Sequence, residues 1–340
     1  MEQIEKLAVI TTGGDAPGMN AVIRAVTRTA TSNYIKVVGF HKGYEGILNM
    51  DYEDLTSASV SNIIQKGGTK LKTSRSKDFR QKKNQEFAAE VLKRSKIDAL
   101  VVIGGDGSFK GARELARLGI NVIGIPATID LDVVSTSYTI GFDTACNTAV
   151  EMIDKLRDTG DATERCFVVQ VMGNKCGALA AAIAEAVGAD YCVVPEHPED
   201  NDIDKIAKCL QERRANGKRF HIVLVAEGCL EDIPEGHGQK NLIKFVLELE
   251  KASGIETRGQ DLGYIIRGGG PSRFDRDAAT VMGKHAVNLL LKGERNRIVA
   301  FGDKVGTPID YDIEEALEME RVFDSELYNR SNAMSQAKPS

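Results

Sequence analysis

Short apolar runs alternate along the chain with segments whose apolar residues recur at helical spacing. In the first half, the runs at 6–11, 36–40, 99–103 and 121–125 predict strands. Helical spacing predicts helices over 19–30, 85–94 and 109–118. Because these strands are almost continuously apolar and alternate with helices, the pattern favours a parallel sheet covered by helices on both faces.

The second half of the chain repeats this pattern. Strands are predicted at 166–171, 191–194, 221–225 and 297–301, and helices at 179–187, 205–214 and 239–253. The sequence therefore predicts an α/β protein with two Rossmann-like, three-layer domains. In such open sheets ligands bind beyond the carboxyl ends of the strands, and most of the glycine-rich and acidic motifs follow a predicted strand.

Composition narrows the class of protein. The 340 residues are 42% hydrophobic and 27% charged, with a formal net charge of −5. This charge argues against nucleic acid or an anionic membrane as the main partner. The N-terminus has no charged segment followed by an apolar run of signal-peptide length, no apolar run is long enough for a membrane span, and the six cysteines form no CxxC pair. We expect reduced thiols, no zinc site and a cytoplasmic location.

The first motif, TTGGDAPGMNAVIR at 11–24, lies between a predicted strand and a helix. Glycines let the backbone approach a ligand closely, and a helix start offers free N–H groups, so the motif suits a phosphate. It is neither a Walker A loop nor GxGxxG. The alternative is a tight turn with Asp15 near the start of the helix.

The second motif, IGGDGSF at 103–109, has the same order of strand, glycines and helix. Asp106 is a candidate ligand for Mg²⁺, and Ser108 is a candidate donor to a phosphate at the helix N-terminus. The alternative is that Asp106 merely caps the helix.

The third motif, PATIDLDVV at 126–134, contains two acids after a predicted strand. In extended backbone Thr128, Asp130 and Asp132 point to one side, and Leu131 points to the other. One carboxylate then holds a metal ion while the other removes a proton from an attacking hydroxyl. The alternative is a solvated acidic loop.

Several arginines lie near glycine turns, and arginine suits bidentate phosphate binding. They are Arg75, Arg165, Arg258 and Arg267. Each alone is also explained as a solvated surface residue. The turn MGNKCG at 172–177 and Glu227 at a strand end are weak signals by themselves.

Together these motifs resemble the ATP-dependent phosphofructokinase family, bacterial type, over roughly residues 5 to 325. GGDAPGMNA, GGDGS, TIDxD, IGFDTA, MG, ETRxxxLG and RGGxPxxxDR all occur in family order. The resemblance implies the phosphofructokinase fold and transfer of the γ-phosphoryl of ATP to the 1-hydroxyl of fructose 6-phosphate in glycolysis. It also implies Mg²⁺ and a homotetramer.

The resemblance implies roles for the nucleotide and metal residues. The residues implied to bind ATP are Gly14, Tyr44, Arg75, Gly105, Asp106, Gly107 and Ser108. Mg²⁺ is implied at Asp106 and Asp132. Asp130 is the implied base, with Thr128 and Arg75 as further catalytic residues. Gly107 favours ATP over pyrophosphate, because pyrophosphate-using members typically carry Asp there.

The resemblance also implies a sugar-phosphate site and an effector site. The sugar phosphate is implied to contact Thr128, Asp130, Met172, Gly173, Glu227 and Arg267, joined by Arg165 and Arg258 of a neighbouring subunit. An ADP or phosphoenolpyruvate effector is implied at Arg24, Arg28, Arg157, Asp190, Lys218 and Arg219. The alternative for the effector residues is an ordinary basic subunit interface.

Domain limits follow from the same resemblance. We expect an ATP-binding domain at 1–140 plus about 265–310, a sugar-phosphate-binding domain at 141–264 plus about 311–325, and a frayed tail at 326–340.

Five residues depart from the family pattern: Ser76, Ala127, Leu131, Asn174 and Tyr264 stand where it usually has an aromatic residue, Gly, Asn, Arg and His. These departures leave two alternatives open. One is a kinase for sedoheptulose 7-phosphate or tagatose 6-phosphate, and the other is a catalytically weak regulatory paralogue.

Overall fold

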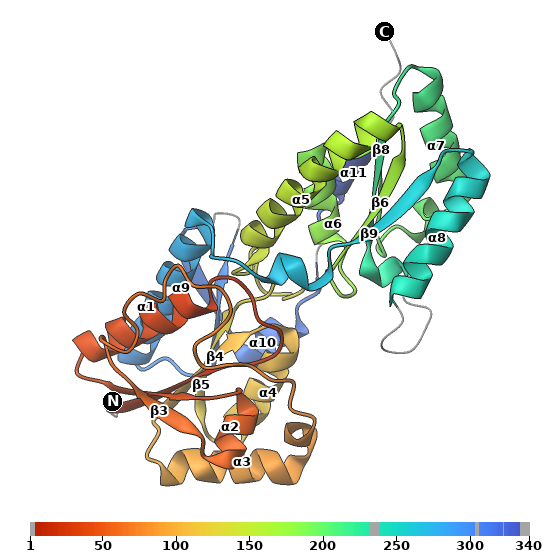
Figure 1. Cartoon of the computed structure of the whole chain (residues 1–340). Helices are drawn as coiled ribbons and strands as arrows, with labels where there is room; N and C mark the ends of the chain where they lie inside the picture. Colours follow the sequence, from red (N-terminus) through yellow and green to blue (C-terminus); the bar gives the residue numbers. More distant parts are fainter. Residues whose placement is uncertain (1–3, 231–237, 303–305, 322, 334–340) are drawn as a thin grey trace. The chain divides into compact units, whose positions relative to one another are not determined.

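A computed structural model describes residues 4–230, 238–302, 306–321 and 323–333 of the chain (Figure 1). The chain divides into two compact units, each built from two stretches of sequence. The first unit is Met1–Thr144 with Arg267–Arg321, and the second is Ala145–Ile266 with Val322–Ser340. The chain passes from one unit to the other after Thr144 and after Ile266, close to the limits expected near residues 140 and 265.

The placement expected for 311–321 in the second domain is wrong, because this segment belongs to the first unit. Strand β11 (Pro308–Asp312) pairs antiparallel with β10 (Arg297–Phe301). Helix α10 (Ile313–Glu318) follows and buries Ile313 in the core of the same unit. Strand pairing and apolar burial therefore hold the segment there.

The sheet of the first unit has seven strands within the described residues, in the order β11-β10-β5-β4-β1-β2-β3. The central strands β1, β2, β4, β5 and β10 are parallel, and the outer strands β3 and β11 are antiparallel to their neighbours. The bounds of the strands not yet given are β1 Lys6–Thr11, β2 Lys36–Phe40, β3 Tyr52–Leu55, β4 Ala99–Gly104 and β5 Asn121–Pro126.

Helices cover both faces of this sheet. Ala8 and Ile10 belong to a core that also takes side chains from α2 (Tyr44–Asn49), α3 (Lys82–Arg94) and α4 (Asp106–Arg117). Leu7 and Val9 are equally buried and face the other way, since side chains alternate along a strand. Helices α1 (Met19–Ser32) and α9 (Arg273–Leu291) pack against each other, and α9 contacts β5.

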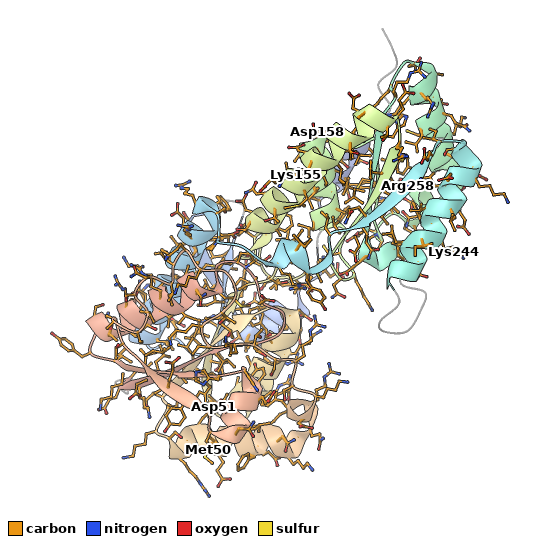
Figure 2. All side chains as sticks on the ribbon, in the orientation of Figure 1. Met50, Asp51, Lys155, Asp158, Lys244 and Arg258 are labelled. Carbon is orange, nitrogen blue, oxygen red and sulfur yellow. The ribbon has the colours of Figure 1, made fainter. Side chains whose placement is uncertain are left out.

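The second unit has a parallel sheet in the order β7-β8-β6-β9 within the described residues. Its strands are β6 Cys166–Val171, β7 Tyr191–Val193, β8 His221–Ala226 and β9 Thr257–Asp261. Helices α7 (Ile203–Ala215) and α8 (Gly238–Ser253) close one core, and α6 (Ala178–Val187) contacts β8. Helix α5 (Phe142–Thr163) presents exposed charged residues, such as Lys155 and Asp158 (Figure 2).

The expectation of a frayed tail from residue 326 is wrong for its first part, and residues 334–340 lie outside the described residues. Helix α11 (Ser325–Ala333) is docked on the second unit. Tyr328 is 2% exposed and stacks on His197, with ring centroids 4.4 Å apart. The Asn332 amide accepts a hydrogen bond from the Cys192 N–H (2.9 Å) and donates one to the Cys192 carbonyl (3.3 Å). Asn332 thus provides hydrogen-bond partners for the N–H and the carbonyl of Cys192 on the outer edge of β7.

Among the described residues, no helix is long and apolar enough to cross a membrane. The six cysteines are free thiols, and burial raises the pKa of Cys166 and Cys192.

Candidate active site

Three neighbouring strands of the first unit, β1, β4 and β5, end at the same edge of the sheet and carry the three motifs. Their loops are tightly packed. A Cβ on Gly104, the last residue of β4, would lie 2.5 Å from the Thr12 carbonyl oxygen. Thr12 donates its N–H to Ile103, and Ala127 donates its N–H to Gly104. The two glycine-rich loops and the acidic turn therefore form one connected surface.

Helix α4 begins at Asp106, three residues earlier than the sequence pattern predicts, with Gly105 as its N-cap. Asp106 and Gly107 therefore occupy the first turn, where N–H groups have no acceptor within the helix and the helix dipole favours an anion. A Cβ on Gly107 would meet nothing within 4 Å. The first turn is thus open at Gly107.

Ser108 and Tyr44 are committed to internal contacts. The Ser108 hydroxyl donates to the Thr12 carbonyl (3.0 Å), and the Tyr44 hydroxyl donates to the Ser108 carbonyl (2.6 Å). Tyr44 also stacks on Phe79 at 4.0 Å, and its burial raises the pKa of the phenol. In this structure both side chains brace the first turn of α4 instead of presenting free hydroxyl groups.

Lys110, which sequence reasoning did not single out, contacts this turn. Its ammonium lies 2.7 Å from the Asp106 carboxylate. The two residues are four apart on one helix, so the sequence spacing was the signal that could have revealed the pair. A divalent cation at Asp106 would compete with this ammonium.

The acidic turn after β5 is not extended, so the expectation that Thr128, Asp130 and Asp132 alternate on one side of a strand is wrong. The strand ends at Pro126 and a bend follows at Ile129 and Asp130. The Asp130 N–H bonds to the Thr128 hydroxyl (3.2 Å), and Leu131 has a left-handed backbone with φ of 52°. This local hydrogen bond curls the chain, as hydroxyl side chains do in turns.

Asp130 nevertheless lies beside a cation and the first glycine loop. The Arg267 guanidinium is 3.9 Å from the Asp130 carboxylate and donates to the Asp15 carbonyl (3.1 Å). Both side chains are buried, with Arg267 6% and Asp130 8% exposed. A Cβ on Gly14 would lie 2.6 Å from the guanidinium, so Gly14 makes room for Arg267. The turn thus pairs a buried carboxylate with a counter-charge.

Asp132 faces the start of α4. A Cβ on Gly105 would lie 3.6 Å from Thr128 and 3.9 Å from Asp132 Oδ1, and Asp106 follows Gly105 directly. The Asp132 carboxylate thus lies beside the backbone that carries Asp106. Carboxylate oxygens are the ligands that Mg²⁺ prefers, so Asp106 and Asp132 fit a magnesium ion.

Arg75 lies on a segment attached to the first glycine loop. Gly13 donates its N–H to the Ser74 carbonyl (3.2 Å), and the Thr73 hydroxyl donates to the Gly13 carbonyl (2.9 Å). Arg75 is exposed and has no hydrogen bond or ion pair with any described residue. Ser76, one of the departures, accepts the Phe79 N–H at 3.2 Å and so caps a turn.

The aspartate of the RGGxPxxxDR motif, Asp275, has a structural role. Asp275 in the first turn of α9 is fully buried and accepts hydrogen bonds from the Tyr138 hydroxyl (2.6 Å) and the N–H groups of Gly141 (2.7 Å) and Thr144 (2.9 Å). Burial nevertheless raises the pKa of Asp275 above its ordinary value. This carboxylate anchors the segment that follows the acidic turn.

In the second unit, Glu227 holds the turn after β6. Its carboxylate accepts the N–H groups of Gly173 (3.1 Å) and Asn174 (2.7 Å). Met172 is half-buried in the same turn. Asn174 has φ of 54°, a conformation that Asn adopts more readily than most residues. The structure thus brings together the second-unit candidates Met172, Gly173 and Glu227.

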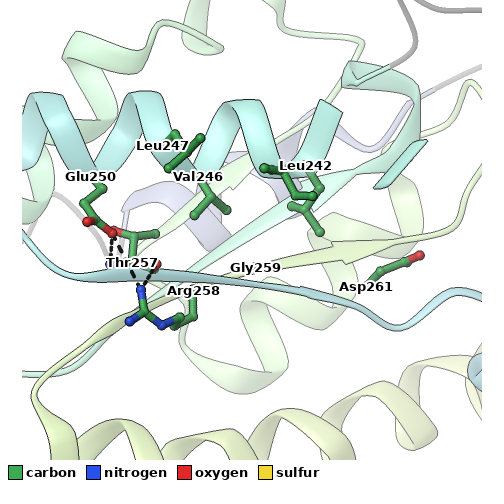
Figure 3. Close-up of a pocket in the computed structure, with 9 residues that line it drawn as sticks. Leu242, Val246, Leu247, Glu250, Thr257, Arg258, Gly259 and Asp261 are labelled. Atoms are coloured by element: carbon green, nitrogen blue, oxygen red, sulfur yellow. Dashed lines mark hydrogen bonds and ion pairs between the residues drawn. The ribbon is translucent and has the colours of Figure 1, made fainter. Parts of the chain in front are cut away.

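Arg165 and Arg258 also meet in the second unit. Both pair with Glu256, at the starts of the adjacent strands β6 and β9. Arg258 further lies 3.8 Å from Glu250 at the end of a groove between α8 and β9 (Figure 3). The apolar wall of the groove is made by side chains such as Leu242, Val246 and Leu247 on α8.

The six candidate effector residues divide between the units. Arg24 and Arg28 lie on α1 of the first unit, where desolvation and the nearby charge of Arg28 lower the pKa of Arg24. In the second unit, Arg157 pairs with Asp154 (3.4 Å), and Arg219 lies 4.0 Å from Glu164.

Asp190 is an internal counter-charge, because it is fully buried and contacts both Lys218 (2.6 Å) and Arg213 (2.5 Å). Burial alone would raise the pKa of Asp190, but His221, Lys218 and the Ile222 N–H lower it to about 2. Its inclusion as a direct effector contact therefore disagrees with the structure, because the carboxylate is not exposed. Arg213 was missed by sequence reasoning.

Comparison with known proteins shows the family of this chain and its relatives. The sequence profile of the phosphofructokinase family matches residues 6–290. The chain belongs to the phosphofructokinase family. Among relatives of this phosphofructokinase-family chain, the ATP-dependent 6-phosphofructokinase of Clostridium botulinum is 47% identical over 97% of this chain and 99% of its own. The ATP-dependent 6-phosphofructokinase 1 of Clostridium perfringens is also 47% identical, with the same coverage.

Solved structures show the phosphofructokinase fold. The phosphofructokinase of Saccharomyces cerevisiae superposes with a TM-score of 0.81 at 31% identity, covering 97% of this chain and 48% of the yeast chain. A pyrophosphate-dependent phosphofructokinase from Marinobacter aquaeolei has a TM-score of 0.79 at 21% identity, covering 99% of this chain and 93% of its own. The latter likeness concerns the fold alone.

Proposed function

We propose that this protein is an ATP-dependent 6-phosphofructokinase, which transfers the γ-phosphoryl group of ATP to the 1-hydroxyl of fructose 6-phosphate. The observation that carries this proposal is the meeting of the three loops at one edge of the first sheet. There a carboxylate beside a cation, Asp130 with Arg267, lies next to a helix start that is open at Gly107. The relatives named ATP-dependent 6-phosphofructokinases, matched over almost the whole chain, support the same activity.

The residues of the first unit have distinct proposed roles. Asp130 takes the proton of the sugar hydroxyl as it attacks, and Arg267 offsets the charge of this carboxylate before the proton arrives. Thr128 shapes the turn through its bond to the Asp130 N–H and faces Gly105. Arg75, exposed beside the glycine loop, contributes charge to the nucleotide phosphates.

The nucleotide phosphates lie against the first turn of α4 in this proposal. Gly105 and Gly107 allow a close approach, Gly14 leaves room for Arg267, and Ser108 and Tyr44 support the turn from behind. Asp106 and Asp132 would hold Mg²⁺, which neutralises phosphate charge when it is bound. Without the metal ion, the Lys110 ammonium pairs with the Asp106 carboxylate.

The second unit supplies the sugar-phosphate contacts in this proposal. Glu227, which fixes the turn of Met172 and Gly173, positions the sugar. Arg165 and Arg258 contact the 6-phosphate of a sugar bound by a neighbouring subunit, so a homotetramer is the working assembly. A phosphate-bearing effector such as ADP or phosphoenolpyruvate binds at Arg24, Arg28, Arg157, Lys218 and Arg219, and the cytoplasm is the proposed location.

Two departures from the family pattern favour a second candidate, a kinase for sedoheptulose 7-phosphate or tagatose 6-phosphate. Tyr264 stands where the family pattern has a histidine, and its side chain is 83% exposed. Asn174 replaces the arginine of the family pattern and suits its left-handed backbone. Both changes fall on the proposed sugar side.

The deciding experiment measures turnover of the purified protein with ATP or pyrophosphate as donor and each of the three phosphosugars as acceptor. The primary proposal predicts that ATP and fructose 6-phosphate give the highest kcat/KM, with fructose 1,6-bisphosphate as product. A preference for another sugar supports the second candidate. Turnover far below ordinary kinase rates with every acceptor supports a regulatory paralogue and contradicts both kinase proposals.

A further inference from the structure

Glu256 lies between two arginines at one end of the second sheet. Its Oε1 atom is 3.0 Å from the Arg165 Nε atom and also contacts the Arg258 Nη2 atom. These two ion pairs hold the pKa of Glu256 below its ordinary value, with Arg165 as the main cause. One carboxylate oxygen therefore serves both guanidinium groups.

The backbone sets this arrangement. Arg165 directly precedes β6 and Glu256 directly precedes β9, and the two strands pair in parallel with Cys166 opposite Thr257. The Cys166 N–H donates to the Glu256 carbonyl (2.9 Å), which fixes Glu256 beside Arg165. The strand register therefore recreates the three-residue contact whenever this unit folds.

A carboxylate and a phosphate group satisfy arginine in the same way, through acceptor oxygens opposite the planar guanidinium. We propose that Glu256 is an internal competitor for the phosphate group of the sugar-phosphate substrate. The inference rests on the proposed function, because it takes Arg165 and Arg258 as the arginines that bind this phosphate. The carboxylate must leave both arginines before the phosphate binds them.

The exchange has a defined direction. A phosphate monoester carries nearly two negative charges and three acceptor oxygens, so it replaces a single carboxylate with a gain in attraction. The displaced Glu256 side chain remains close to the bound dianion and repels it. Glu256 therefore raises the substrate concentration needed for saturation and discriminates against ligands with weaker anionic groups.

The test is Glu256→Gln, which keeps the shape of the side chain and removes its charge. Because all three side chains are partly exposed, KM for fructose 6-phosphate is expected to fall about three- to tenfold, with kcat within about twofold. The apparent dissociation constant of inorganic phosphate, measured by calorimetry, is expected to fall in parallel. Thermal unfolding of the variant checks that the fold is retained.

Two acids on α8 provide matched controls. Glu248 pairs with Lys244 (3.9 Å), labelled on α8 in Figure 2, and contacts neither arginine, so Glu248→Gln is expected to leave KM unchanged. Glu250 is 3.8 Å from Arg258 Nη1 and accepts the Thr257 N–H (2.9 Å), which glutamine can still do. Glu250→Gln is expected to lower KM less than Glu256→Gln does.

An unchanged or higher KM in Glu256→Gln overturns the inference; a higher value would mean that Glu256 orients the arginines for the substrate. Should this substitution fail to fold, Glu256→Ala is measured in its place against the same criterion. If the wild type turns over no phosphosugar, the proposed function fails instead. The inference is then decided by phosphate calorimetry, where equal affinity of wild type and variant contradicts it.

Discussion

Two turns that follow parallel strands each contain a residue with left-handed backbone, but the residue types differ in how well they tolerate that conformation. After β5 in the first unit, Leu131 adopts φ of 52°, a strained conformation for leucine. After β6 in the second unit, Asn174 adopts φ of 54°, which asparagine tolerates well. Each turn is also tied by a polar side chain, Thr128 in the first and Glu227 in the second.

The comparison teaches where the chain tolerates strain. The β5 turn carries the two acids proposed for the chemistry and keeps a leucine where the family pattern has asparagine. The β6 turn, proposed for sugar binding, has an asparagine where the pattern has arginine. Strain is commonly retained at sites that do chemistry, so the β5 turn is expected to be the catalytic one and the β6 turn a relaxed binding element.

The largest difference between the two turns is expected in kcat. Asp130→Asn should lower kcat by about 10²–10⁴, because the amide cannot accept the hydroxyl proton. ATP affinity, measured by calorimetry, should stay unchanged. Asp132→Asn is the control, and it should instead raise the Mg²⁺ concentration needed for half-maximal rate. Equal kcat in Asp130→Asn and wild type would refute the assignment of the base.

The β6 turn should respond in KM. Glu227→Ala removes the acceptor of two backbone N–H groups, and a hydrogen bond to a charged group is worth about 1.5–3 kcal/mol. KM for fructose 6-phosphate should therefore rise about 10- to 100-fold. Glu227→Gln keeps an acceptor oxygen and should have a smaller effect. Steady-state kinetics separates the cases, and a loss confined to kcat would contradict a binding role.

Buried carboxylates extend the comparison to acid stability. The folded pKa of Asp190 in the second unit, about 2, lies below its unfolded value, so its contribution of about 2 kcal/mol is present above pH 4 and lost as pH falls toward 2. The raised pKa of Asp275 in the first unit has the opposite sign: its contribution is present at low pH and lost as pH rises through the folded pKa.

Denaturant unfolding of wild type and Asp190→Asn at pH 7 and pH 2.5 checks this. The stability gap between the two proteins should narrow at the lower pH. A gap of constant size would show that Asp190 does not titrate in this window.

The smallest effect is expected from the strained backbone itself. Leu131→Asn should stabilise the protein by about 0.5–1 kcal/mol, and Asn174→Leu should destabilise it by a similar amount. Scanning calorimetry should show shifts of a few degrees in opposite directions. Shifts of the same sign would mean that side-chain packing outweighs backbone strain at one of the turns.

Much of the framework was predictable from the sequence. The strands at 6–11, 36–40, 166–171 and 297–301 have the predicted bounds, because continuous apolar runs mark buried parallel strands. Helices α5 and α9 were not predicted. Their first residues lie in the motifs IGFDTA and RGGxPxxxDR, whose glycine and aspartate residues are typical of loops. The start of α4 was missed for the same reason.

The site was predictable in its residue types but not in its contacts. The prediction for Asp130 was wrong because the backbone is not extended beyond Pro126; a side-chain hydrogen bond from the Asp130 N–H to Thr128 bends the chain there. The contact of Asp130 with Arg267 joins residues far apart in sequence, and no local pattern reports it. The commitment of Ser108 to Thr12 is equally a product of tertiary packing.

The split composition of both units has a consequence for how the protein is made. Strand β5 meets its outer neighbour β10 only after residues 297–301 have been synthesised, long after β5 itself. The Cys192 backbone on β7 waits still longer, for Asn332. During synthesis the edge of β5 therefore stays unpaired until β10 has emerged, and the outer edge of β7 lacks its Asn332 contact until α11 has emerged. These two exposed edges are the places at which a partly synthesised chain is expected to aggregate.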